Sequence, residues 1–177
     1  LIPFQDLGRE LGEFFERVCA ERRLTIEFSA EPDAAVVRSD MRLLNLILRN
    51  LIENATKFAF EDTTVRVLAR AVAPGSGEPA SSRRDLVIEV EDRGIGIPIG
   101  LQSRIFERFF QADPARAGNG KRGTGLGLAI VKHAVRTLGG RVSVESVWKQ
   151  GTTMRVEIPD AIPAPSDFAG AASAATR

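Results

Sequence analysis

This sequence of 177 residues has few cysteines, histidines and tyrosines, and its positive and negative charges almost cancel. It has one cysteine, one histidine, no tyrosine and a net charge of only +1. The single Cys19 excludes an internal disulfide and a thiolate metal cluster, and it favours a reducing compartment such as the cytoplasm. Its position on an apolar helical stripe predicts a buried structural thiol. The balanced charge excludes a chain-wide field that would bind nucleic acid or a membrane surface.

Long hydrophobic runs are also missing. No apolar stretch approaches the roughly 20 residues that a membrane-spanning helix needs, and the chain begins at Leu1 without a basic and then apolar leader. We therefore expect a cytoplasmic segment of a larger protein, without direct membrane contact. The sequence does contain 44% hydrophobic and 27% charged residues. These shares fit one globular domain with a substantial core.

Hydrophobic periodicity predicts alternating helices and strands, and therefore an α/β domain over residues 1–159. The side chain of Ser39 is expected to cap the second helix, and the last two strands are expected to form an antiparallel hairpin. Residues 73–82 predict a solvated loop, and the Ala, Pro and Ser rich residues 160–177 predict a linker or disordered tail. The predicted helices are 3–23, 39–58, 99–112 and 125–138, and the predicted strands are 24–28, 64–70, 85–90, 141–147 and 153–158.

The second predicted helix carries a polar stripe. Asn50, Asn54 and Lys57 are spaced at i, i+4 and i+7, beside an apolar sector that includes Phe58. The amide oxygen of Asn54 suits a hard cation such as Mg²⁺, and Lys57 is suited to neutralise phosphate oxygens. Taken alone, the stripe also fits an ordinary solvated helix edge.

An acidic residue and two glycines follow the strand predicted at residues 85–90. Asp92 comes first, and Gly94 and Gly96 then permit positive φ or a close backbone approach to a ligand. Asp92 can accept a hydrogen bond from the amino group of adenine, whereas guanine presents an acceptor at the matching position. An ordinary Asp-Gly turn is the alternative.

A second glycine-rich segment, residues 123–128, opens the last predicted helix. Free N–H groups and the positive end of a helix dipole favour phosphate at such a position. A Walker loop is excluded because this chain has Gly120-Lys121-Arg122, with Ala115 where the first glycine belongs. The Rossmann fingerprint is excluded because its G-x-G-x-x-G spacing is absent and no predicted strand precedes Gly123.

Together these segments resemble the catalytic, ATP-binding domain of sensor histidine kinases, of the GHKL superfamily. Residues 50–58 resemble the N box, 92–98 the first glycine box, 105–113 the F box and 123–130 the second glycine box. The likeness covers about residues 1–159. It implies a Bergerat fold, a two-layer α/β sandwich in which helices cover one face of a mixed sheet, and a site for ATP and Mg²⁺ beneath a lid at about residues 111–122.

The resemblance also implies a role for each matching residue. Asn54 would ligate Mg²⁺, Asp92 would read adenine, and Phe58 would pack near the base, with Thr152 close by. Gln111 stands where many members carry a basic residue, so the contact to the terminal phosphate is left open among Arg108, Arg116, Lys121 and Arg122. The remaining nucleotide-binding positions are Lys57, Gly94, Gly96, Ile97, Gly123, Thr124, Gly125, Leu126 and Gly127.

The single His133 lies inside the last predicted helix without the acidic surroundings of a phosphoacceptor, so it is predicted to be a helix-surface residue. The resemblance then implies phosphoryl transfer to a histidine on a separate dimerisation domain, and onward to a response regulator receiver domain. Asn50 stands where related ATPases carry a water-activating glutamate, which favours transfer over hydrolysis. The alternatives are a non-catalytic ATP-sensing domain, a GHKL ATPase and an anti-sigma serine kinase.

Overall fold

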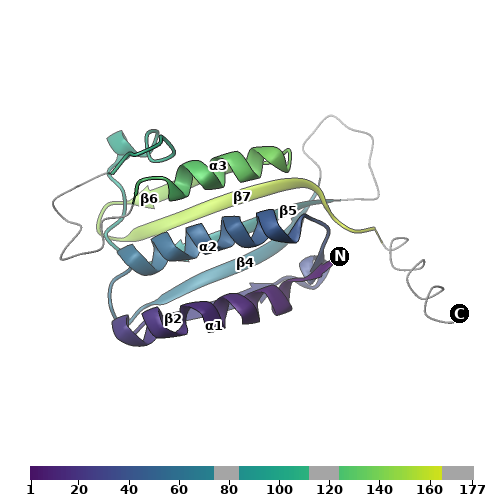
Figure 1. The fold of residues 1–177 in the computed structure, drawn as a ribbon, viewed down its shortest axis with the longest axis horizontal. Coiled ribbons are helices and arrows are strands. Elements are labelled where there is room, and N and C mark those ends of the chain that lie inside the picture. The colour runs from purple at the N-terminus through teal and green to yellow at the C-terminus, as the bar shows by residue number, and fades with distance from the viewer. Residues whose placement is uncertain (74–83, 112–123, 165–177) are drawn as a thin grey trace, which may run out of the picture.

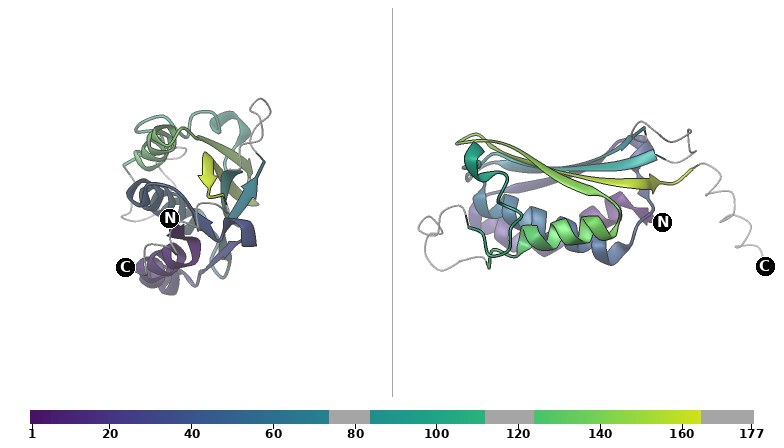
Figure 2. Two further views of the ribbon diagram at one scale, coloured as in Figure 1. Left: turned by 90° about the vertical axis from the view of Figure 1, so that its right-hand side faces the viewer. Right: turned by 90° about the horizontal axis from the view of Figure 1, so that it is seen from above.

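The computed structural model describes residues 1–73, 84–111 and 124–164. In this part of the chain a five-stranded sheet forms one layer, and α1, α2 and α3 together cover one of its faces (Figure 1, Figure 2). The strand order is β2-β4-β5-β7-β6, in which β2 and β4 are parallel and the other neighbours are antiparallel. The predicted two-layer α/β sandwich with a mixed sheet is therefore confirmed.

The bounds of the elements are as follows. The helices are α1 (Phe4–Arg22), α2 (Met41–Phe58) and α3 (Gly127–Thr137), with short 3-10 segments η1 (Pro32–Ala34) and η2 (Ile99–Leu101). The sheet contains β2 (Thr25–Ala30), β4 (Thr64–Val72), β5 (Arg84–Asp92), β6 (Arg141–Val147) and β7 (Gly151–Ile162). A separate antiparallel pair joins β1 (Ile2–Pro3) to β3 (Val36–Val37). None of the described helices is long and apolar enough to cross a membrane.

The core lies between the sheet and the helices. Alternate residues of the central strands face the helical layer, so Val67 of β4 and Ile88 of β5 are fully buried, as is Leu48 of α2. Cys19 packs at the edge of this core and is partly exposed, so the prediction of a buried thiol was too strong. Partial burial raises the pKa of its thiol.

The N-terminal cap of α2 differs from the prediction. Asp40, not Ser39, caps the helix, because its carboxylate Oδ1 accepts from the N–H groups of Arg42 at 2.8 Å and Leu43 at 3.2 Å. A carboxylate is a stronger acceptor than a hydroxyl, and its charge also complements the helix dipole. The Ser39 hydroxyl is instead buried without a hydrogen-bond partner.

The helix predicted over residues 99–112 is not present in the described part of that segment. Residues 99–111 form η2 and a series of turns, held by N–H groups that bond to carbonyls three residues back. An α-helix of this length needs an apolar face to bury. Ile105 is buried, but Ile99 is 85% exposed and Phe109 is 72% exposed, so that face does not form.

The final strand is longer than predicted. β7 continues past Pro159 to Ile162, because its pairing with β5 extends to a contact between Arg84 and Ile162. The predicted antiparallel hairpin of β6 and β7 is confirmed. The division into a domain and a tail stays a prediction, since residues 165–177 lie outside the described residues, as does most of the predicted loop at 73–82.

Candidate functional site

The polar stripe of α2 lies against the beginning of α3. Asn50 donates its amide Nδ2 to the carbonyl of Leu46 at 2.8 Å, which leaves Oδ1 on the side of Gly127. A Cβ atom added to Gly127 would lie 3.0 Å from Asn50 Oδ1 and 3.9 Å from Asn54 Nδ2. The structure therefore brings the N box and the second glycine box together, and a glycine at this point allows the close approach.

The C-terminal end of α2 carries two predicted site residues. The Lys57 ammonium lies 5.2 Å from the centroid of the Phe58 ring, a cation–π distance. Phe58 is 41% exposed, so it is not part of the apolar sector as predicted and its ring is available to a ligand. The guanidinium of Arg22, from α1, donates to the carbonyls of Thr56 and Lys57, both at 2.6 Å.

Asp92 ends β5 as a buried carboxyl group. Its exposed fraction is 8%, and its Oδ1 has no hydrogen-bond partner. Burial raises its pKa from 3.8 to about 7; a hydrogen bond with the backbone of Thr152 acts in the opposite direction, and the charge of Glu91 adds a smaller increase. A buried acceptor without a donor destabilises the folded protein when no ligand is bound. A ligand with an N–H group would supply the missing hydrogen bond.

The first glycine box fits tightly between α2 and the hairpin of β6 and β7. Gly94 packs against the Phe58 carbonyl and Asp92 Oδ1, where a Cβ atom would collide with both. Gly96 has φ +65°, a backbone conformation that side chains disfavour, and it lies so close to the backbone of Val147 that a Cβ atom would not fit. Both features favour glycine at this position. Ile97 donates its N–H to Ser146 Oγ at 2.8 Å. These contacts hold the loop beside Asp92.

The second glycine box is described from Thr124 onward. Gly125 has φ +70° and packs on the backbone of Phe109, whose N–H donates to the Gly125 carbonyl at 2.9 Å. Thr124 is exposed and Leu126 half-buried, and Leu126, as the N-cap residue, gives the start of α3 no side-chain hydrogen bond. N–H groups at such a helix terminus suit phosphate oxygens. Lys121, Arg122, Gly123 and Arg116, with most of the predicted lid, lie outside the described residues.

The residues that surround Asp92, Asn54 and Gly127 have a counterpart among known families. The family model described as histidine kinase-, DNA gyrase B- and HSP90-like ATPase matches residues 39–162, which include α2, both glycine boxes and Thr152. The chain belongs to this ATPase family. The resemblance to the histidine kinase catalytic domain, based on the four boxes, is thereby confirmed.

Sensor histidine kinases are prominent among the curated relatives of this ATPase-family chain. AtsR of Burkholderia thailandensis is 36% identical over 153 residues, which cover 84% of this chain and 24% of AtsR. AruS of Pseudomonas aeruginosa is 46% identical over 124 residues, which cover 68% of this chain and 11% of AruS. The chain thus spans a quarter or less of each of these two relatives.

Solved structures of histidine kinases share the fold of this ATPase-family domain. Full-length ShkA, crystallised in complex with AMPPNP, has a TM-score of 0.72 and 29% identity, and the match covers 92% of this chain and 31% of ShkA. The catalytic domain of the histidine kinase ThkA has a TM-score of 0.69 at 23% identity, over 90% of this chain and 93% of that domain. The ThkA match supports the fold alone.

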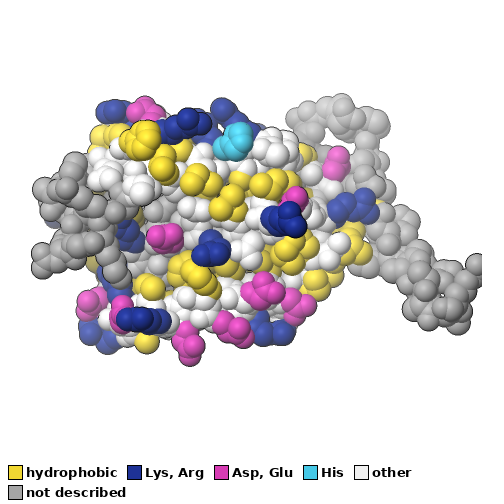
Figure 3. Space-filling model, viewed as in Figure 1, with side chains coloured by type: hydrophobic (Ala, Val, Ile, Leu, Met, Phe, Trp, Pro, Cys, Tyr) yellow, Lys and Arg dark blue, Asp and Glu magenta, His cyan; other side chains and the backbone are white. Residues whose placement is uncertain are grey.

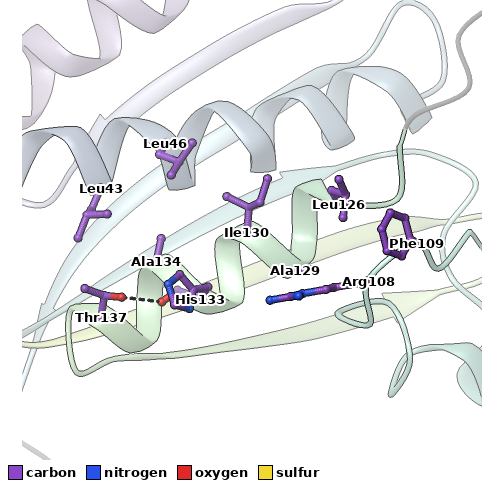
Figure 4. A pocket seen from close by; sticks show the side chains of 10 residues that line it. All are labelled: Leu43, Leu46, Arg108, Phe109, Leu126, Ala129, Ile130, His133, Ala134 and Thr137. Carbon is purple, nitrogen blue, oxygen red and sulfur yellow. Dashed lines mark hydrogen bonds between the residues drawn. The ribbon is translucent and has the colours of Figure 1, made fainter.

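A shallow groove of about 490 Å³ lies between α2 and α3, lined by neither Asp92 nor Asn54 (Figure 4). Leu46 and Ile130 line it from the two helices, and Figure 3 shows hydrophobic side chains on this face beside the histidine. His133 is exposed on α3, as predicted. Arg108 also lines the groove, as does Leu126 of the second glycine box, and the contact of Arg108 to a terminal phosphate stays a prediction.

Sequence reasoning missed two residues that support the site. Arg22 holds the end of α2 through three carbonyls, those of Thr56, Lys57 and Ala59, and no local pattern indicates such a long-range contact. Ser146 contacts Ile97 and Thr152. A signal for Ser146 was present, because the alternation of β6 places it on the same face as the partly buried Val142 and Val144, where a polar residue is unexpected.

Proposed function

We propose that this chain binds ATP with Mg²⁺ and transfers the γ-phosphoryl group to a histidine on a separate dimerisation domain. The observation that carries the nucleotide proposal is the buried, unpaired Oδ1 of Asp92, packed against Gly94 at the end of β5. An exocyclic amino group of adenine supplies the missing donor. The known complex of ShkA with AMPPNP, an ATP analogue, supports the same ligand class.

Phosphate and its cation would be held by a second group of residues in the site. The N-terminal N–H groups of α3 and the ammonium of Lys57 are suited to phosphate oxygens, and Asn54, beside Gly127, offers an amide oxygen to Mg²⁺. When bound, Mg²⁺ neutralises charge on the phosphates. Because Gly127 has no side chain, Asn50 Oδ1 can lie close to the helix terminus. The proposal places the domain in the cytoplasm, where ATP is available.

Asn50 favours transfer over hydrolysis. Its Nδ2 is bound to the Leu46 carbonyl, and the side chain contains no carboxylate that would deprotonate water. A neutral histidine already has a free lone pair and needs little base catalysis. In the proposed step the imidazole nitrogen forms a bond to the γ-phosphorus, the bond to the bridging oxygen breaks with its electron pair going to ADP, and the imidazole proton passes to solvent.

A reconstitution experiment tests this function. The chain is mixed with Mg²⁺, ATP labelled on the γ-phosphate, and the dimerisation domain of the full-length protein, with its phosphoacceptor His→Gln variant as the control. We expect an acid-labile, base-stable phosphate on the unmodified domain only, which then passes to an added response regulator receiver domain. Release of inorganic phosphate alone would indicate an ATPase, and an acid-stable phosphate would indicate a serine kinase. Binding without any turnover would indicate a nucleotide sensor.

A further inference from the structure

The hydroxyl of Ser146, near the end of β6, has three hydrogen-bonding neighbours. Ser146 Oγ lies 2.8 Å from the N–H of Ile97, 2.8 Å from the carbonyl of Gly151 and 2.9 Å from Thr152 Oγ1. Gln102 reinforces the arrangement, because its Nε2 donates to the carbonyls of both Ile97 and Ser146. Ser146 therefore joins the first glycine box to the beginning of β7.

The direction of these hydrogen bonds follows from the single proton of a hydroxyl group. Ile97 supplies an N–H group, so Ser146 Oγ accepts there. Gly151 supplies a carbonyl, so Ser146 Oγ gives its own proton there. The contact with Thr152 is then satisfied only if the Thr152 hydroxyl donates to Ser146. Thr152 Oγ1 has no further proton, and it offers only lone pairs to a ligand.

Strand register places this oxygen beside Asp92. Asp92 pairs with Thr152 across β5 and β7, and Thr152 pairs with Ser146 across β7 and β6. Side chains directly opposite each other in an antiparallel sheet lie on the same face, with Cβ atoms roughly 5 Å apart. Asp92, Thr152 and Ser146 therefore form one polar row on the helical face of the sheet.

We propose that Ser146 is a positioning residue for base selection, which holds Thr152 Oγ1 as a hydrogen-bond acceptor next to the unpaired Oδ1 of Asp92. This inference rests on the proposed binding of ATP at Asp92. Two adjacent acceptors match the two hydrogens of an exocyclic amino group. A nucleotide that carries a carbonyl oxygen at the same ring position, such as ITP, presents a third acceptor and is disfavoured.

Titration calorimetry of the 177-residue chain with ATP and with ITP, both with Mg²⁺, tests the proposal. Ser146→Ala frees the Thr152 proton, which then can donate to the carbonyl of ITP. We expect the preference for ATP over ITP to fall about tenfold. In a Thr152→Ala background the same substitution is expected to leave the preference unchanged, because the two residues act as one unit.

Two further variants separate base selection from structural support. Ser146→Thr keeps the hydroxyl and is expected to keep the preference, which is a measurement independent of whether Ser146→Ala folds. Ser143→Ala alters an exposed serine of the same strand, on the opposite face, and is expected to change neither affinity. The proposal would be overturned if Ser146→Ala weakened the binding of ATP and ITP equally. It would also be overturned if Ser146→Thr lost the preference for ATP over ITP. Absence of binding to either nucleotide in the unmodified chain would instead refute the proposed function beneath it.

Discussion

Asp92→Asn is expected to abolish a distinctive pH dependence of stability. Burial raises the pKa of the Asp92 carboxyl from 3.8 to about 7 in the folded protein. The folded state therefore binds more protons than the unfolded state between these values, so the free energy of unfolding falls as the pH rises through this window. Above pH 7 the loss is complete, and it amounts to about 4 kcal/mol. An asparagine has the same shape and does not titrate.

The assay is urea unfolding of the parent chain and the variant at pH 5 and at pH 8. The difference between their free energies of unfolding isolates this one group, because every other titrating residue is common to both proteins. We expect the difference to shift in favour of the variant by about 3 kcal/mol between the two pH values. Asp6→Asn, which changes an exposed carboxylate on α1, is the matched control for the same substitution outside the core.

This prediction would be refuted if the difference in free energy of unfolding between the parent chain and Asp92→Asn stayed the same at both pH values. That result would mean that the carboxyl is solvated in the folded chain. Nucleotide adds a second, independent test, since an ionised Asp92 is the better acceptor for the adenine amino group. Binding would then release a proton below pH 7, and affinity for ATP would decline as the pH falls in the parent chain but not in Asp92→Asn. Calorimetry in buffers of different ionisation enthalpy measures that proton.

Three further predictions concern other parts of the site. Asn54→Ala should remove the Mg²⁺ dependence of ATP binding while the melting temperature stays near that of the parent; undiminished dependence would exclude the metal role. Gly127→Ala should keep or raise stability, because alanine has a higher helix propensity than glycine. The added methyl group should weaken ATP binding, because it crowds Asn50 Oδ1, and an unchanged affinity in calorimetry would contradict this prediction. Arg22→Met should lower the free energy of urea unfolding by about 2 kcal/mol, because part-buried carbonyls at the end of α2 lose their donor. Arg17→Met changes a side chain that is 89% exposed and should cost little.

Local periodicity predicted most of the sheet because side chains alternate along each strand regardless of what lies far away in sequence. Val65 and Val67 of β4 face the core as their spacing requires. The errors fell at the ends of elements, where distant partners decide. β7 extends to Ile162 because Arg84 lies opposite it, and no local pattern in residues 159–162 contains that information.

The parts of the candidate site that lie close together in the sequence could be predicted, and the contacts between distant segments could not. Asn50 and Asn54 share a helix, so their spacing alone placed them on one stripe. Their contact with Gly127 joins segments more than seventy residues apart, and only the resemblance to a family implied it. For Phe58 the local pattern itself was misleading. Its position in the apolar sector of α2 predicted burial, but it is the last residue of the helix and is 41% exposed.

The clearest physical mark of the site is a break in an otherwise apolar pattern. On the helical face, Val90, Met154 and Val144 form one row across β5, β7 and β6, and each of the three lies within or against the core. The neighbouring row, two residues away on each strand, is Asp92, Thr152 and Ser146. Buried polar groups cost free energy unless they are paired. Ser146 and Thr152 pair with each other, but Asp92 Oδ1 has no partner. The fold therefore maintains a destabilising feature, which the N–H donor of the proposed nucleotide would offset. An apolar residue at this position would restore the pattern and raise stability, and it would remove the acceptor on which we base the assignment of the nucleotide site.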